Sequence, residues 1–161
     1  MDNLSIARLF ANIGDLLELK GENTFKIRAY RAAADIIGHA SEPFAELNTE
    51  ELLAIPGIGK AIAEKIREIA ETGRLTFHQK LLGEFPTTIL DLLHLQGVGP
   101  KTVALLYQGL GLGSIDELEI AATEGRLSSL PGLGPKKEQL ILTAVARHRQ
   151  SEGRPLRRTA T

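Results

Sequence analysis

Three copies of one fifteen-residue pattern divide this chain of 161 residues. The copies occupy residues 52–66, 92–106 and 127–141, and they read LLAIPGIGKAIAEKI, LLHLQGVGPKTVALL and LSSLPGLGPKKEQLI. Each has leucine first, an aliphatic residue fourth, glycine sixth and eighth around another aliphatic residue, and an apolar residue last. A solenoid would require more copies at a tighter period, so offsets of 40 and 35 residues indicate one supersecondary unit used three times.

Each copy is predicted to form two helices joined by a tight turn. The paired glycines allow backbone angles that a Cβ atom forbids, and they let another molecule approach the main chain. The aliphatic residue between them, which is Ile58, Val98 or Leu133, is expected to anchor the turn in the core. Because the second helix begins directly after the turn, its unpaired N–H groups and positive dipole end predict an anion site.

Lysine follows the second glycine within three residues in every copy. An ammonium group beside the turn could pair with a phosphate oxygen, and such contacts hold nucleic acid without reading its sequence. The candidate phosphate-binding residues of the three turns are Gly57, Gly59, Lys60, Gly97, Gly99, Lys101, Gly132, Gly134, Lys136 and Lys137. The alternative is that each turn only forms a corner between helices. A Rossmann or P-loop site is excluded, because no strand precedes the glycines and neither motif is complete.

Helical periodicity extends over nearly the whole chain, so the sequence predicts an all-α fold. The apolar stripe that begins at Leu4 ends before Gly21, and Asn48 with Glu51 is typical of a capped helix start. No run of four or more residues shows the alternation of a strand. The other helices are expected near residues 24–38, 61–71, 76–83, 86–95, 100–109, 115–123 and 135–149.

Composition excludes several classes of protein. The chain has no cysteine, which rules out disulfides and cysteine zinc sites and is compatible with a reducing compartment. Its four histidines lack metal-ligand spacing, and no apolar run is long enough to span a membrane. A net charge of −1 argues against attraction of a polyanion by a global field, although residues 101–161 carry 9 basic and 6 acidic residues. Any DNA contact is therefore expected to be local.

Four segments carry a resemblance to a known family. They read LELKGENTFKIRAYRAAADII at 17–37, IPGIGKAIAEKIREIAETGRL at 55–75, LQGVGPKTVALLY at 95–107 and LSSLPGLGPKK at 127–137. The glycine turns resemble the helix-hairpin-helix motif, and the combination over about residues 1–150 resembles the N-terminal part of bacterial, beta-type family X DNA polymerases. The resemblance implies two small helical subdomains with three helix-hairpin-helix motifs. They would be a lyase-like domain at 1–82 and a fingers-like module at 83–150, with 151–161 as a linker or disordered tail.

The same resemblance implies a site and its partners. Gapped or nicked DNA would be bound on its 5′-phosphate side, with Lys26 and Tyr30 in the phosphate pocket and Lys65 as a Schiff-base lysine that excises 5′-deoxyribose phosphate. The hairpins of this family also place a Na⁺ or K⁺ ion on turn carbonyls. The corresponding carbonyls here are those of Leu53, Ile55, Ile58, Leu93, Leu95 and Val98. No Asp-x-Asp pair on strand-like sequence is present, so Mg²⁺ is expected only in a polymerase palm that this sequence lacks.

Lys65 is the fourteenth residue of its copy, where the other two copies have Leu105 and Leu140. Both leucines are expected to lie in the core, which would make the lysine exceptional. A Schiff base needs a neutral amine, and the alternative is a solvated lysine paired with a neighbouring glutamate. Phe25 and Ala61 stand where the family has a histidine and a second lysine. The sequence therefore favours DNA holding over lyase chemistry.

Three functions remain open from the sequence. The chain could be the DNA-holding part of a family X repair polymerase, a Schiff-base lyase in its own right, or a stand-alone module that binds DNA or protein without catalysis. A monomer is expected, in the bacterial cytoplasm and associated with the nucleoid. If the chain is a fragment, a C-terminal polymerase region would follow it.

Overall fold

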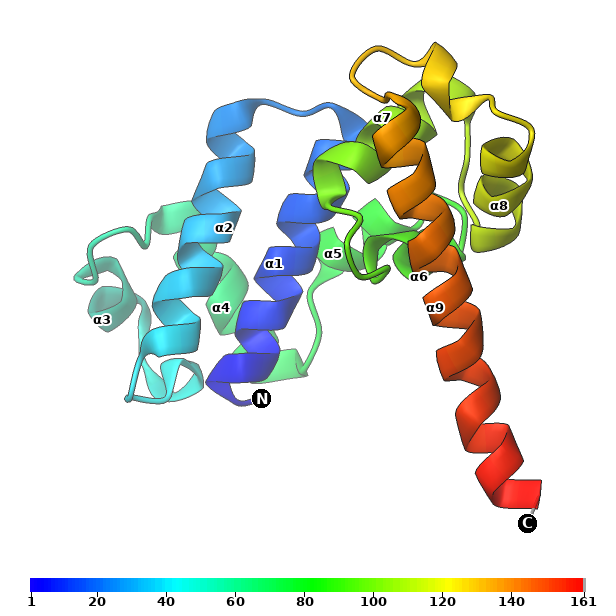
Figure 1. The fold of residues 1–161 in the computed structure, drawn as a ribbon. Coiled ribbons are helices and arrows are strands. Elements are labelled where there is room, and N and C mark those ends of the chain that lie inside the picture. The colour runs from blue at the N-terminus through cyan, green and yellow to red at the C-terminus, as the bar shows by residue number, and fades with distance from the viewer. Residues whose placement is uncertain (161) are drawn as a thin grey trace. The chain divides into compact units, whose positions relative to one another are not determined.

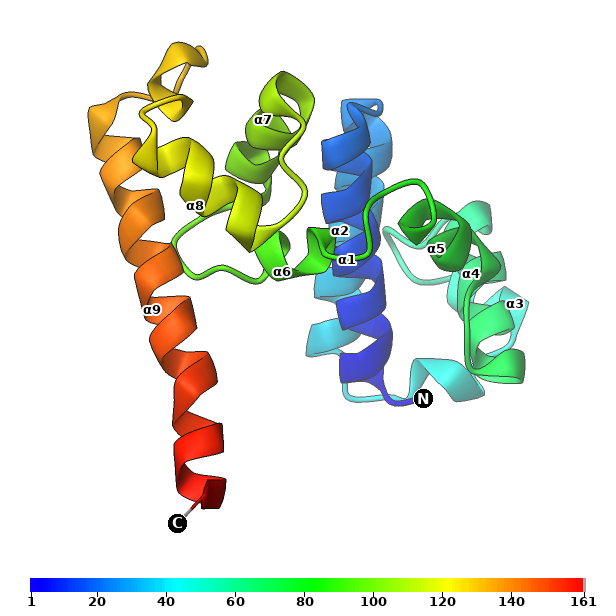
Figure 2. The same ribbon diagram turned by 90° about the vertical axis from the view of Figure 1, so that its right-hand side faces the viewer.

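The computed structural model describes the backbone of residues 1–160 and the side chains of residues 1–151. Within that range all regular structure is helical, which confirms the all-α prediction. The chain divides into two compact units, Met1–Glu84 and Phe85–Thr161. Figure 1 and Figure 2 show the helices of each unit from two directions.

The first unit is built on two long helices, α1 (Asn3–Lys20) and α2 (Thr24–His39), which lie side by side in Figure 1. A 3₁₀ turn, η1 (Phe44–Glu46), leads to the short helix α3 (Thr49–Leu53). Two further helices, α4 (Lys60–Thr72) and α5 (Thr76–Leu82), complete the unit. The apolar stripes of these helices meet in one core. Its most buried large side chains include Ile6, Phe10, Ile13, Leu16, Ile37, Phe44, Leu52 and Ile66.

Local capping fixes the helix ends of this unit. The side chain of Asp2 accepts a hydrogen bond from the amide of Ser5 and begins α1, while Gly21, at φ 78°, ends it. Asn48 and Glu51 form the expected capping box at α3. These bonds satisfy backbone groups that have no partner inside the helix, which is why short sequence signals located these boundaries well.

Two arginines connect helices through polar contacts. Arg31 on α2 donates to Glu18 at 3.1 Å and to Asp15 at 3.2 Å, and thereby ties α2 to α1. Arg67 on α4 donates to the carbonyls of Ala45 and Leu47 at 3.1 and 2.9 Å, which holds η1 against α4. A planar guanidinium with several donors suits both arrangements.

The second unit contains α6 (Ile89–Leu93), α7 (Pro100–Leu110), α8 (Ile115–Thr123), the 3₁₀ turn η2 (Leu127–Ser129) and α9 (Pro135–Ala160). Its core is aliphatic and includes Leu92, Val103, Leu106, Leu118, Leu127, Ile141 and Val145. Arg149 donates to Asp116 at 2.6 Å and to Glu119 at 3.1 Å, so an ion pair fastens α9 to α8.

Two helix boundaries in this unit differ from the sequence prediction. A helix over 86–95 is wrong at its start, because Pro86 packs against Gly113 and the hydroxyl of Thr88 donates to the Gly113 carbonyl at 2.6 Å. These tertiary contacts hold 86–88 outside the helix. The last helix continues to Ala160, through most of the segment 151–161 expected as a linker or disordered tail, since each added residue closes one more backbone hydrogen bond. Thr161 lies outside the described residues.

Candidate nucleic-acid interface

The three glycine turns share one backbone conformation. The first glycine of each pair has a positive φ, at 92° in Gly57, 87° in Gly97 and 85° in Gly132. Residues with a Cβ rarely adopt this region, so glycine is required at this position in all three copies. The repetition of one unusual angle in three separate places confirms that the copies form the same turn.

The aliphatic residue between the glycines is buried in every turn. Ile58, Val98 and Leu133 are 4%, 5% and 3% exposed. Each donates its amide to the carbonyl three residues earlier, at 3.1, 3.3 and 3.1 Å respectively. The aliphatic side chain therefore anchors the turn in the core of its unit, while the glycines on either side remain at the surface.

The second glycine leaves the following helix start uncovered. Gly59 and Gly99 are the N-caps of α4 and α7, both in extended conformation, and no side chain caps either helix. A Cβ built on Gly59, Gly99 or Gly134 would meet nothing within 4 Å. The first amides of these helices point away from the helix body and carry the positive end of the helix dipole. They can therefore donate to an approaching anion without steric obstruction.

The lysines beside the turns lie on the surface. Lys60, Lys101, Lys136 and Lys137 are all exposed, and none forms an ion pair with a described residue. A turn corner buried against other helices would have excluded a phosphate contact. The opposite arrangement is found at the second glycine of each turn, which has open space in front of it, with solvent-facing ammonium groups beside it at all three turns.

Lys65 lies against an aromatic stack in the first unit. Its Nζ is 5.0 Å from the ring centre of Phe77 and 5.9 Å from that of Tyr30. The Tyr30 ring stacks between Phe77 at 5.8 Å and Phe10 at 5.9 Å. The negative faces of such rings favour the charged ammonium. Lys65 is therefore half-buried at the edge of the core, with its Nζ over two rings.

The expectation that Leu105 and Leu140 lie in the core is wrong. Leu105 is 38% exposed and Leu140 is 61% exposed. The second helix of each copy turns its fifteenth residue inward, namely Ile66, Leu106 or Ile141, and the fourteenth residue then lies about 100° away around the helix. Position fourteen thus faces outward in the two sister copies, and a lysine there is not exceptional.

The pocket that Lys26 lines does not include Tyr30. Tyr30 is buried in the aromatic stack, whereas Lys26 is exposed and lies 3.7 Å from Glu22. Lys26 instead lines a pocket of about 360 Å³ with Lys20 and Lys80, and Phe77 forms part of the same wall. The sequence analysis missed Lys20 and Lys80, because they come from α1 and α5 and no motif connects them.

One cation of this pocket is held by a carboxylate. Lys20 Nζ lies 2.9 Å from Glu84 Oε1. This hydrogen bond raises the pKa of Lys20, so its ammonium stays charged over the physiological range. The pocket therefore combines three lysines and an aromatic wall with the carboxylates of Glu22 and Glu84.

The carbonyls considered for a monovalent cation lie at the first two turns. In each set one oxygen already accepts the turn hydrogen bond, that of Ile55 from Ile58 and that of Leu95 from Val98. A carbonyl oxygen has a second lone pair, so this bond leaves one ligand position on each. Neutral oxygen donors of this kind fit a hard monovalent ion.

Two features are absent from the part of the chain that the structure describes. No helix there is long and apolar enough to cross a membrane. No group of three or more histidine, aspartate or glutamate side chains is placed to hold a metal ion in that part either.

Comparison with known proteins matches both units to related families. Residues 1–75 match a helix-hairpin-helix domain, and residues 89–147 match a SAM-like helix-hairpin-helix tandem. The chain is 33% identical over 145 residues to the DNA polymerase/3′-5′ exonuclease PolX of Bacillus subtilis (strain 168), which covers 90% of the chain and 25% of that protein. It is 27% identical over 151 residues to DNA polymerase lambda of Arabidopsis thaliana, which covers 93% of the chain and 27% of that protein.

The chain thus spans about a quarter of the length of these curated relatives. The tandem match places the second and third turns in one module, and the first turn falls in the separate N-terminal match. The chain carries helix-hairpin-helix domains in both units and corresponds to the N-terminal region of the bacterial family X DNA polymerases.

Proposed function

We propose that this chain binds DNA through backbone phosphates, without sequence preference, and holds it for a family X polymerase. The observation that carries the proposal is the uncapped helix start behind an exposed second glycine, with a surface lysine beside it, at three turns of one conformation. Each turn offers backbone amides and one or two ammonium groups to a single phosphate. Contacts of this kind position a duplex and carry no sequence information.

The proposed substrate is gapped or nicked DNA with a 5′-phosphate. Support comes from the pocket in the first unit that is lined by Lys20, Lys26 and Lys80 beside an aromatic wall. Glu84 and Glu22 pair with Lys20 and Lys26, so Lys80 is the ammonium of this pocket without an ion pair to a described residue. A terminal phosphate carries more charge than a phosphodiester and gains more from such a cluster. The names of the two relatives, both DNA polymerases, agree with a DNA substrate.

The test is fluorescence anisotropy with gapped DNA, 5′-phosphorylated or unphosphorylated, across a range of salt concentrations. We expect tighter binding of the phosphorylated gap. We also expect Lys101→Gln to lower the slope of log K against log salt by about 0.9, whatever the DNA sequence. Arg74→Gln removes an equal charge beyond the far end of α4 and serves as control. Affinity that does not change with salt would overturn the proposal and favour a protein-docking module.

A Schiff-base lyase step at Lys65 is the second candidate. It is favoured by one observation: the Phe77 ring beneath Lys65 also lines the three-lysine pocket, so a bound 5′-terminal sugar would lie near the amine. The amine would add to the C1′ aldehyde of the sugar with loss of water. β-Elimination would then remove a proton from C2′ and break the C3′–O bond, so that the downstream strand leaves with a 5′-phosphate, and water would hydrolyse the remaining imine to free Lys65. The attack requires the free amine of Lys65, whose Nζ lies over the two rings.

Borohydride trapping separates this step from binding alone. Lyase chemistry predicts a covalent adduct with 5′-deoxyribose phosphate DNA in the parent chain and none in Lys65→Ala. Absence of an adduct in the parent, with gapped-DNA affinity intact, would remove the lyase and leave DNA holding. Lys65→Arg, which keeps the charge over the rings, is the matched control for affinity.

The remaining parts of the proposal concern the surroundings of the chain. A Na⁺ or K⁺ ion would be held by the turn carbonyls named above and would add positive charge at the bound phosphate. A monomer in the bacterial cytoplasm, associated with the nucleoid, suits a protein that holds repair intermediates. Nucleotidyl transfer with Mg²⁺ would belong to a polymerase palm outside the present sequence.

A further inference from the structure

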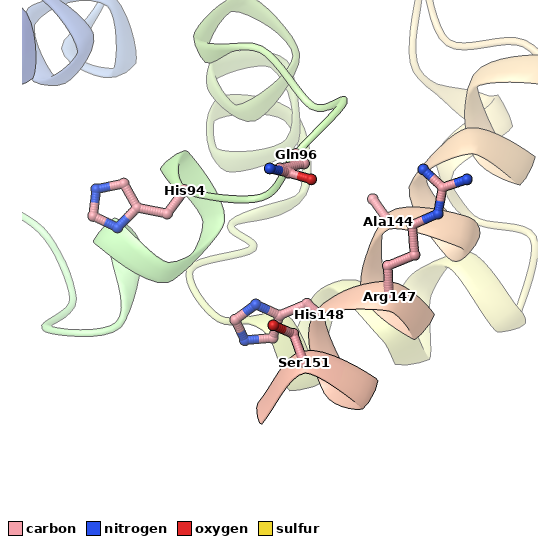
Figure 3. A pocket seen from close by; sticks show the side chains of 6 residues that line it. All are labelled: His94, Gln96, Ala144, Arg147, His148 and Ser151. Carbon is pink, nitrogen blue, oxygen red and sulfur yellow. The ribbon is translucent and has the colours of Figure 1, made fainter. Parts of the chain in front are cut away.

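A hollow of about 260 Å³ lies in the second unit beside the second glycine turn. One wall comes from the turn, through His94 and Gln96, and the other from α9. The α9 wall consists of Ala144, Arg147, His148 and Ser151. Figure 3 shows Gln96 on one side of this space and the α9 side chains on the other.

The lining of the hollow consists mainly of hydrogen-bond donors. Gln96 contributes an amide, Ser151 a hydroxyl, His148 an imidazole and Arg147 a guanidinium, and no carboxylate is among the lining residues. The imidazole of His94 turns away from α9 in Figure 3 and forms only the rim. A site with several donors, one permanent cation and no anion suits a phosphate group.

Arg147 differs from the other arginines of the described part of this unit. Arg149 is engaged by Asp116 and Glu119, and Arg126 lies 3.4 Å from Glu124. Arg147 is exposed and makes no ion pair with any residue that the structure describes. Its charge is therefore available to an external anion, whereas the charge of Arg149 already stabilises the fold.

The position of the hollow relates it to the second turn. Gln96 immediately precedes Gly97, so the hollow begins where the proposed phosphate site of that turn ends. Successive phosphates along one strand of B-DNA are separated by about 3.4 Å of helix rise. A strand held at Gly97 and Gly99 by one phosphate would bring a neighbouring phosphate within reach of the α9 wall.

We propose that this hollow binds the DNA backbone phosphate next to the one held at the second turn. Arg147 is its cation, Gln96 and Ser151 are its further donors, and His148 lines the same wall. The inference rests on the proposed DNA-binding function and adds a fourth contact, supplied by side chains rather than by a helix start. It makes the middle of α9 part of the DNA-binding surface.

The test compares salt slopes for binding of duplex DNA to the full chain. We expect Arg147→Gln to lower the slope by about 0.9 and Gln96→Ala to weaken binding without changing the slope. Arg126→Gln, which removes the same charge from the same unit, should leave the slope unchanged. Arg147→Lys should restore the slope, which separates loss of charge from damage to the fold.

Chemical-shift titration of His148 and Gln96 gives a second measurement. DNA should shift both signals, and the Gln96 shift should be lost in Arg147→Gln. If Arg147→Gln and Arg126→Gln have equal salt slopes while Lys101→Gln has a lowered one, the phosphate site in the hollow is refuted and the proposed DNA-binding function stands. An unchanged slope in Lys101→Gln as well would overturn both. Saturation by inorganic phosphate at a lower concentration than by DNA phosphate would show a free-anion site and refute the inference.

Discussion

At the residue scale, the two glycines of each turn have different structural roles. Gly57 has a φ of 92°, and a Cβ there would come within 2.5 Å of the Ile36 side chain. Gly59 is extended, at φ −89°, and has open space in front of it. The first glycine is therefore required by the fold, whereas the second keeps the helix start accessible.

This division predicts opposite effects of one variant on stability and binding. Gly59→Asp should keep or raise the free energy of unfolding. Aspartate is a preferred N-cap, and the interaction of its negative charge with the helix dipole stabilises a helix by about 0.3–1 kcal/mol. It should weaken DNA binding, since the carboxylate occupies the amides and repels phosphate. Urea unfolding and anisotropy measure the two effects.

Two controls accompany this prediction. Gly59→Asn caps the helix without the charge, so it should lose less affinity than Gly59→Asp. Gly57→Ala should lower the free energy of unfolding by about 1–2 kcal/mol or more, because its left-handed backbone disfavours a Cβ and that Cβ would also meet the Ile36 side chain. If Gly59→Asp binds DNA as tightly as the parent, the first turn does not contact phosphate.

His78 provides a pH-dependent prediction. Its Nε2 lies 2.7 Å from Asn12 Oδ1, and burial lowers the pKa of its imidazole. Below about pH 6.5 the imidazole of His78 binds a proton more readily in the unfolded chain than in the folded one. The free energy of unfolding should therefore fall as the pH drops below that value. Unfolding measured at pH 7.5 and 5.5 should show this loss.

The control for His78 is His78→Gln, which keeps a donor toward Asn12 but does not titrate. Its stability should change less between the two pH values than that of the parent. Glu68 should not contribute to this pH dependence. Hydrogen bonds from the amide and hydroxyl of Thr76 lower the pKa of its carboxyl, so its effect on stability appears only in more acidic solution. Identical pH profiles for the two proteins would contradict the prediction.

At the scale of elements, Arg31 joins α2 to α1 with a fork of two ion pairs. Arg31→Gln should lower the free energy of unfolding by about 1 kcal/mol, because the pairs with Asp15 and Glu18 are only partly shielded from solvent. Arg31→Lys should recover little of this free energy, since an ammonium cannot place two donors as the planar guanidinium does. DNA affinity should remain unchanged in both variants, and a lowered salt slope would show that Arg31 binds phosphate instead.

The sequence predicted those elements whose ends are set locally. Gly21 and the Asn48–Glu51 pair act on the backbone within a few residues, so their signals could be read directly. The start of α6 could not be predicted, because it depends on contacts of Pro86 and Thr88 with Gly113, some 25 residues later. The exposure of Leu105 and Leu140 was missed for a similar reason, since apolar character alone does not show which face of a helix is covered.

At the scale of the whole molecule, the repeat predicted more of the candidate site than any single residue type did. Three copies of one pattern indicated three turns, and the structure shows them with one backbone conformation. The pocket with Lys20 and Lys80 and the hollow with Arg147 join residues distant in sequence, and only packing brings them together. Sites made by the backbone of a repeat were therefore predictable, and sites made by converging side chains were not.

The net charge of −1 makes the position of each lysine decisive for DNA binding. A chain without a strong overall field cannot attract DNA at long range, so each contact must act locally. Lys60→Gln, Lys101→Gln and Lys136→Gln combined should lower the salt slope by about 2.7, as the sum of three separate phosphate contacts. The matched control combines Arg8→Gln, Arg74→Gln and Arg126→Gln, which removes the same three charges away from the turns. Its slope should stay near that of the parent, and equal losses in the two triple variants would mean that overall charge, rather than the glycine turns, governs binding.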